Sequence, residues 1–137
     1  MLWHADSTFK AVPSLCSVLT AREVPPNGGD TEFTSTRALY ESLDPATQAQ
    51  LDGGVVEHDF TWARARSGFV FNDAQRDENP PARHPLVQTN PVTGRKSLMI
   101  GAHAKCIVGW DADKSRNMLD DLLDRATAPD KIYVHKW

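Results

Sequence analysis

Short apolar runs separated by turn residues dominate the hydrophobic pattern of the chain, and such runs are typical of strands. The segment SLCSVLTA at 14–21 mixes small and β-branched residues and predicts a buried strand. Further strands are predicted at 30–33 (DTEF), 55–62 (VVEHDFTW) and 131–137 (KIYVHKW). The segment HPLVQTNPVTGRKSLMIG at 84–101 predicts a hairpin, because Gly94 can adopt the positive φ that a tight turn requires.

Two short helices are predicted between the second and third of these strands. Leu39 and Leu43 lie four residues apart, which places them on one helical face. Asp44 followed by Pro45 predicts the start of the next helix, with a capping side chain and a proline in the first turn. Gly53-Gly54 predicts its end.

A longer helix and an irregular loop complete the pattern. The segment DADKSRNMLDDLLDRAT predicts a helix capped by Asp111 or Asp113. Its core-facing stripe would consist of Met118, Leu119, Leu122, Leu123 and Ala126. Residues 63–83 are predicted to be an irregular surface loop. Because helices and strands do not alternate regularly, the pattern favours a mainly β domain with helical insertions over a parallel βαβ fold.

Composition and charge narrow the class of protein. A chain of 137 residues with 40% hydrophobic and 24% charged residues is expected to form one globular domain. The net charge of −3, without a run of basic residues, gives no reason to expect a nucleic-acid or membrane partner. Cys16 and Cys106 show no metal-ligand spacing, and the chain opens without a secretory signal. We therefore expect free thiols, packed as small hydrophobes, in a cytoplasmic protein.

The opening MLWHADSTFK contains the first candidate chemistry. In a strand, residues i and i+2 point to the same face, so His4 and Asp6 could converge on one metal ion. Two histidines and one carboxylate form the facial triad of non-haem iron(II) oxygenases, whereas zinc prefers further histidine or cysteine ligands nearby. Taken alone, H-x-D is weak evidence, because a His near an Asp is more commonly a hydrogen-bonded pair at the protein surface.

Three motifs, in order along the chain, resemble those of one enzyme family. They are WHADSTF at 3–9, GGDT at 28–31 and HPLVQTNPVTGRKSLMIGAHA at 84–104. Together they resemble the Fe(II)/2-oxoglutarate-dependent taurine and 2,4-dichlorophenoxyacetate dioxygenase (TauD/TfdA) family. GGDTEF and IGAHA are more similar to the phenoxyacetate branch than to the taurine branch.

The resemblance implies a fold, an activity and a set of site residues. The fold would be a double-stranded β-helix, or jelly roll. The activity would couple decarboxylation of 2-oxoglutarate to hydroxylation of a small organic acid by dioxygen, with Fe(II) as the metal. His4 and Asp6 take the places of two iron ligands, and Thr31 that of a threonine whose hydroxyl binds 2-oxoglutarate. Ser7 and His103 fall on the substrate side. The favoured substrate is an aryloxyacetate such as 2,4-dichlorophenoxyacetate, cleaved to a phenol and glyoxylate with release of succinate and CO2.

The resemblance is to an internal part of the family's domain. Residues 1–137 are expected to form a single partial domain, without the N-terminal part and without the late strand that carries the second iron-binding histidine and an arginine for 2-oxoglutarate. His135 matches a histidine in the segment before that strand and is not assigned as the missing ligand. We therefore expect the 137-residue chain alone to be inactive.

Several alternatives stay open from the sequence. They are a dioxygenase for taurine, another alkylsulfonate or another carboxylate, and a non-catalytic jelly-roll binding domain; a homo-oligomer also stays open. Asn90 and Cys106 stand where the phenoxyacetate branch often carries histidine, which bears on the substrate. His58 is predicted to be a strand histidine bonded to a neighbour, and His84 to have a structural role.

Overall fold

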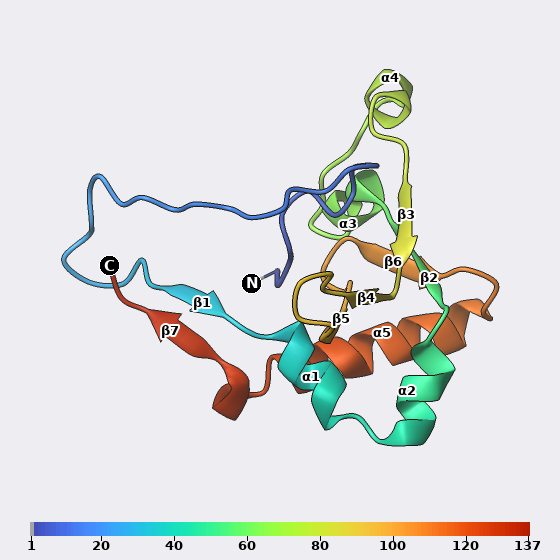
Figure 1. Cartoon of the computed structure of the whole chain (residues 1–137). Coiled ribbons are helices and arrows are strands. Elements are labelled where there is room, and N and C mark those ends of the chain that lie inside the picture. The colour runs from blue at the N-terminus through green and yellow to red at the C-terminus, as the bar shows by residue number, and fades with distance from the viewer. Residues whose placement is uncertain (1) are drawn as a thin grey trace.

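The computed structural model describes residues 2–137, in which helices and short strands alternate irregularly (Figure 1). The strands are β1 (Thr31–Phe33), β2 (Val55–His58), β3 (Ala82–Pro85), β4 (Val87–Thr89), β5 (Lys96–Leu98), β6 (Ala104–Ile107) and β7 (Tyr133–His135). The helices are α1 (Thr36–Ser42), α2 (Pro45–Leu51), α3 (Phe60–Ala65), α4 (Asp73–Asp77), α5 (Ala112–Ala126) and the 3-10 turn η1 (Pro129–Lys131).

The described strands form three small antiparallel sheets. In the largest, β2 lies between β3 and β6, and its pairing with β6 shifts register between Glu57 and His58. The hairpin β4–β5 confirms the predicted turn, in which Gly94 has a φ of +70°. The pair β1–β7 brings two predicted strands together, with Thr31 opposite His135.

The hydrophobic core lies between the sheets and helices α1, α2 and α5. The long helix confirms most of the predicted stripe, because Leu119, Leu122 and Ala126 are buried and Met118 packs against the core, whereas Leu123 is only partly buried. Asp111, rather than Asp113, caps this helix by accepting a hydrogen bond from the backbone N–H of Lys114. The other core residues are Leu39, Tyr40, Leu43, Leu51, Val56, Leu86, Leu98, Ile100, Ala104 and Ile107. The predicted helices therefore pack against both arms of the hairpin predicted at 84–101.

The prediction of a buried strand at 14–21 is wrong. This segment belongs to an exposed extended arm that leaves the body of the molecule and returns at β1 (Figure 1). Leu15 and Val18 are 101% and 86% exposed, and no strand within residues 2–137 pairs with them. An apolar run predicts that a segment can be buried, but a strand also requires a neighbouring backbone to bond with. Cys16, on this arm, is a free thiol but is exposed rather than packed.

Two further predictions are wrong in extent. The strand predicted over 55–62 ends at His58, because Asp59 caps α3 by accepting a hydrogen bond from the backbone N–H of Trp62 at 2.9 Å. The stretch 63–83, predicted to be irregular, contains the end of α3 and all of α4. Asn72 and Gln75 form a capping box there, a local signal that the irregular interpretation overlooked.

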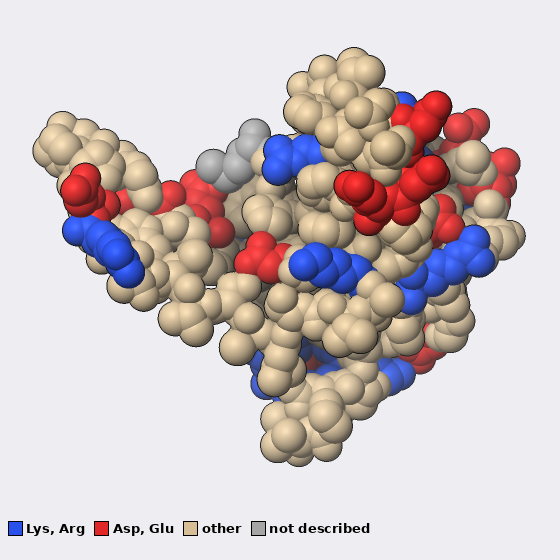
Figure 2. Space-filling model, turned by 90° about the horizontal axis from the view of Figure 1, so that it is seen from above, with Lys and Arg blue, Asp and Glu red and all other residues tan. Residues whose placement is uncertain are grey.

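The surface carries both signs of charge. Figure 2 shows acidic and basic side chains interspersed on the face that it presents. In the part of the chain that the structure describes, no helix is both long and apolar enough to cross a membrane.

Candidate metal centre

The segment that carries His4 and Asp6 is a turn, not the strand expected from the sequence. Residues 6–9 form this turn, in which Ser7 has a φ of +60°. The turn nevertheless brings the two side chains together, since His4 Nε2 lies 3.3 Å from Asp6 Oδ1. Positive φ at a residue other than glycine is strained, and such strain is common at functional sites.

The two side chains are arranged as metal ligands would be. His4 Nδ1 lies 3.0 Å from the carbonyl oxygen of Leu2, which can only accept, so Nδ1 donates this hydrogen bond and Nε2 is the ring nitrogen that faces Asp6. The second carboxylate oxygen of Asp6 accepts a hydrogen bond from the Ser17 hydroxyl. Adjacent donors on one ion, with bonds of about 2.1 Å, lie about 3 Å apart, close to the separation found here. Both side chains are about half exposed, at 51% and 52%, so an ion can reach them.

Among the described residues, no third candidate ligand lies beside His4 and Asp6. Within residues 2–137, no group of three His, Cys, Asp or Glu side chains could hold a metal ion. His135 lies on β7, paired with β1, and does not join the pair.

Residues far along the chain hold this turn in place. The backbone N–H of Ala102 donates to the Trp3 carbonyl at 2.8 Å. Gly101 has a φ of +140°, and a Cβ atom there would meet His4 Cα at 3.2 Å, so glycine is needed for this close approach. His84 Nε2 donates to the carbonyl oxygens of Thr8 at 2.9 Å and Lys10 at 3.1 Å, in line with its predicted structural role.

A first cavity of about 480 Å³ opens beside the pair and contains both predicted substrate-side residues, Ser7 and His103. Its walls include Phe9 and Phe60, whose ring centroids lie 4.7 Å apart. The ring centroid of Phe9 lies 4.9 Å from that of His103. Burial lowers the pKa of His103, and the nearby charge of His4 adds to this effect. The cavity thus joins an aromatic wall to polar groups and to the candidate metal ligands.

A second cavity, of about 610 Å³, also borders the pair, and Thr31 is among its lining residues. His4 and Asp6 line this cavity too, so Thr31 shares one space with the candidate ligands. Its hydroxyl oxygen accepts a hydrogen bond from Trp137 Nε1 at 2.9 Å, which leaves the hydroxyl proton free to be donated. The structure therefore places the other three sequence-predicted site residues, Ser7, His103 and Thr31, in two cavities that His4 and Asp6 both line.

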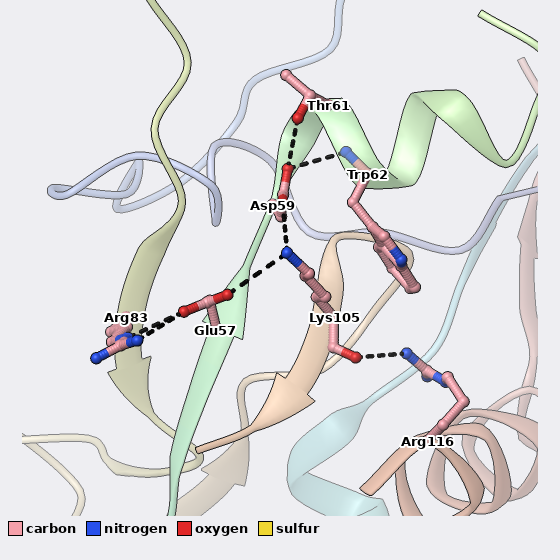
Figure 3. Close-up of polar contacts among 7 residues, drawn as sticks. All are labelled: Glu57, Asp59, Thr61, Trp62, Arg83, Lys105 and Arg116. Carbon is pink, nitrogen blue, oxygen red and sulfur yellow. Dashed lines mark hydrogen bonds and ion pairs between the residues drawn. The ribbon is translucent and has the colours of Figure 1, made fainter. Parts of the chain in front are cut away.

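An ion-pair network fixes the helix that forms one wall of the first cavity (Figure 3). Lys105, on β6, lies 2.9 Å from Asp59 and 3.7 Å from Glu57, and Glu57 also pairs with Arg83 of β3. Burial opposes the ionisation of Asp59, but hydrogen bonds from Trp62, Lys105 and Thr61 outweigh it, and the pKa of Asp59 is lowered. The charged carboxylate therefore ties the start of α3 to β6.

His58 does not behave as predicted. It is fully buried, and neither ring nitrogen has a hydrogen-bond partner within residues 2–137. Its closest aromatic neighbour is His84, with ring centroids 5.7 Å apart. Burial, and then the charge of His84, lower its pKa to about 4. His58 lies on β2, as predicted, but the hydrogen bond predicted to a neighbouring residue is not found among the described residues.

Comparison with known proteins identifies the family. The family model described as "Taurine catabolism dioxygenase TauD, TfdA family" matches residues 1–137. This chain is a member of the TauD/TfdA family. The 2,4-dichlorophenoxyacetate dioxygenase of Cupriavidus pinatubonensis is 42% identical over 99% of this chain and 48% of its own length. The (S)-phenoxypropionate dioxygenase of Sphingobium herbicidovorans is 36% identical over the whole chain and 50% of its own length.

Solved structures of the TauD/TfdA family agree with this assignment. The crystal structure of AAD-2 with Mn(II) and N-oxalylglycine matches with a TM-score of 0.94 and 42% identity, over 99% of this chain and 51% of that one. A taurine dioxygenase from Burkholderia xenovorans matches with a TM-score of 0.83 and 32% identity, and the match covers 98% of this chain and 44% of that one. The chain thus spans about half the length of the relatives that it matches.

Sequence reasoning missed two residues of this site, Gly101 and Arg64, and did not predict which segment His84 supports. Gly101 and His84 act on the turn from about 80 to 100 positions away. Arg64, on the wall of the first cavity, lies in the stretch predicted to be irregular surface. Local spacing gives no signal for any of these contacts, although IGAHA already contains Gly101.

Proposed function

We propose that this chain is part of an Fe(II)- and 2-oxoglutarate-dependent dioxygenase that hydroxylates an aryloxyacetate. The observation that carries the proposal is the pairing of His4 and Asp6, 3.3 Å apart, at the junction of two cavities, in a member of the TauD/TfdA family. When bound, iron(II) supplies the dioxygen chemistry that links 2-oxoglutarate decarboxylation to hydroxylation. His4 Nε2 and one Asp6 oxygen would hold it.

The two cavities suggest a division between cosubstrate and substrate. In the cavity beside Thr31, the hydroxyl proton of that residue is free to be donated to a carboxylate of 2-oxoglutarate. In the other cavity, Phe9 and Phe60 offer apolar contact to an aromatic ring, next to Ser7 and His103. Because the candidate ligands line both cavities, the two molecules would meet at the metal.

The overall reaction balances with these participants. One oxygen atom of dioxygen enters 2-oxoglutarate, which loses CO2 and becomes succinate. The other enters the C–H bond beside the ether oxygen of the aryloxyacetate. The resulting hemiacetal breaks at its C–O bond to give a phenol and glyoxylate. This chain's residues orient the acid so that the reacting carbon faces the metal ligands.

Relatives and the aromatic wall support an aryl substrate. The proteins from C. pinatubonensis and S. herbicidovorans are named for 2,4-dichlorophenoxyacetate and (S)-phenoxypropionate. A taurine or alkylsulfonate substrate is the second candidate, supported by the match to a taurine dioxygenase. Phe9 and Phe60 favour the aryl acid, since an alkylsulfonate has no ring to place against them.

We also infer that residues 1–137 form one part of a jelly-roll domain. The TM-score of 0.94 to the structure of AAD-2, of which this chain covers 51%, supports that inference. A third iron ligand would then come from outside these residues, and the isolated chain should bind Fe(II) weakly and be inactive. The two free cysteines favour a reducing, cytoplasmic setting.

Succinate release tests the proposed function. The protein, expressed from its complete reading frame, is assayed with Fe(II), 2-oxoglutarate and phenoxyacetate, 2,4-dichlorophenoxyacetate or taurine. We expect succinate with the aryloxyacetates, and its loss in Asp6→Ala and His4→Ala. Preference for taurine would favour the second candidate. Absence of turnover, together with unchanged Mn(II) binding in both variants, would support a non-catalytic domain.

A further inference from the structure

Arg64 places a positive charge on the wall of the cavity that it shares with His4 and Asp6. Its side chain is exposed, and no carboxylate within residues 2–137 forms an ion pair with it. Four other arginines are paired with acidic side chains: Arg83, Arg95, Arg116 and Arg125. The guanidinium of Arg64 is therefore available to an anion that enters the cavity.

An aromatic surface lies directly beside this charge. The guanidinium carbon of Arg64 lies 5.6 Å from the centroid of Phe60, and Phe60 packs against Phe9. Both rings line the cavity. One wall thus combines a cation with two aromatic rings, which is the arrangement that recognises a molecule with an aromatic ring and a carboxylate.

The fold holds Arg64 in this place through its backbone. The Arg64 carbonyl accepts hydrogen bonds from the backbone N–H groups of Ser67 at 3.0 Å and Phe69 at 3.3 Å. At the other end of α3, Asp59 is tied to Lys105 in the network of Figure 3. Since none of these contacts uses the guanidinium, replacing the side chain should leave the helix in place.

Arg64 offsets the negative charge of Asp6 on the lining of the first cavity. Asp6 is the acidic residue among the side chains that line the first cavity, and while no metal is bound its charge would repel an anionic substrate. A guanidinium offsets that repulsion and can bind both oxygens of a carboxylate in a fixed geometry. His103 lines the same cavity as Arg64 and Asp6.

We propose that Arg64 determines substrate specificity by binding the carboxylate of the aromatic acid, with the ring of that acid against Phe9 and Phe60. This inference rests on the proposed function, and it names the residue that selects an anionic substrate for the site. Sulfonates share the negative charge, but the two aromatic rings beside Arg64 fit an aryl carboxylate better than a short alkylsulfonate.

Arg66 offers a matched control on the same short segment. It lies two positions beyond Arg64, stacks on Trp62 with 4.9 Å between its guanidinium carbon and the ring centroid, and does not line the cavity. Arg64→Met and Arg66→Met remove the same charge from neighbouring positions. Arg64→Lys retains the charge but loses the planar, two-point contact.

The test uses the protein from its complete reading frame, with phenoxyacetate as the probe. In Arg64→Met we expect the KM for phenoxyacetate to rise about 10- to 100-fold, as for the loss of one hydrogen-bonded charge pair, while the KM for 2-oxoglutarate stays unchanged. Arg64→Lys should be intermediate, and Arg66→Met should match the parent protein. Calorimetric titration of phenoxyacetate into the metal-free protein should show the same order of Kd values.

The outcomes separate this inference from the proposed function. Equal KM and Kd values for phenoxyacetate in Arg64→Met and the parent would overturn the role of Arg64 while turnover persists. An equal loss of affinity for the uncharged phenoxyacetamide would also overturn it, because the carboxylate would then be irrelevant. If the parent shows no turnover but binds phenoxyacetate through Arg64, the proposed reaction fails and the anion site stands. Tighter arginine-dependent binding of taurine than of phenoxyacetate would reject the aryl carboxylate.

Discussion

Acidification should destabilise this chain through a single buried histidine, His58. The ring is 0% exposed, without a hydrogen-bond partner for either nitrogen in the described residues. Its pKa is lowered from 6.5 to about 4 by burial and by the charge of His84, and the Met99 backbone offsets this only in part. In the unfolded chain the same ring would titrate near its ordinary value.

The direction of the effect follows from proton binding in the two states. At pH 7 His58 is neutral in the folded chain and mostly neutral in the unfolded chain, so it adds little pH dependence there. As the pH falls below 6.5, the unfolded chain takes up a proton that the folded chain does not, and the free energy of unfolding decreases. With these two pKa values the loss is about 2 kcal/mol at pH 5 and about 3 kcal/mol at pH 4, below which it levels off.

Urea unfolding of the 137-residue chain at pH 7, 6 and 5 measures this loss. His58→Leu and His58→Gln serve as comparisons, because neither side chain titrates and one of them remains polar. Between pH 7 and pH 5 the parent should lose about 2 kcal/mol more unfolding free energy than either variant, because only the parent carries His58. A difference that stays constant over this range would refute the reasoning, since other titrating groups are common to all three proteins.

Three further substitutions test the packing around the site and in the core. Gly101→Ala should weaken Mn(II) binding, measured by electron paramagnetic resonance, about tenfold through backbone strain and displacement of His4, whereas Gly94→Ala, whose Cβ meets open space, should not. Ser115→Ala should lower the free energy of urea unfolding by about 2 kcal/mol, because the buried backbone N–H that donates to its hydroxyl at 2.6 Å loses its acceptor. Leu122→Ala, at a fully buried position, should lower the same free energy by about 3 kcal/mol, and a change below about 1 kcal/mol would contradict the described core.

Much of the fold could be predicted because its signals are local. The hairpin β4–β5 follows from a turn whose glycine needs positive φ, and the long helix follows from a cap and an apolar stripe within one segment. The arm at 14–21 shows where this fails, since an apolar run does not tell which backbone will pair with it. Helix α3 was missed because the sequence around Asp59 is also compatible with a strand. Only the contacts of Asp59 with Trp62 and Lys105 identify it as the cap of a helix.

In the candidate site, too, local sequence signals predicted some residues but not the contacts between distant positions. His4 and Asp6 could be proposed from their spacing and from the motif around them, although the backbone that joins them is a turn rather than a strand. The contacts that support them come from Gly101 and His84, and the cation beside them from Arg64. Such contacts between distant positions depend on the complete fold, so no local pattern contains them.

The coupled yield of two products tests the central claim most directly. The protein from its complete reading frame is supplied with Fe(II), 2-oxoglutarate, dioxygen and phenoxyacetate, and both phenol and succinate are quantified. The account predicts equal amounts of phenol and succinate, and neither product in Asp6→Ala. Succinate without phenol from any aryloxyacetate, or phenol formed equally well by Asp6→Ala, would contradict it.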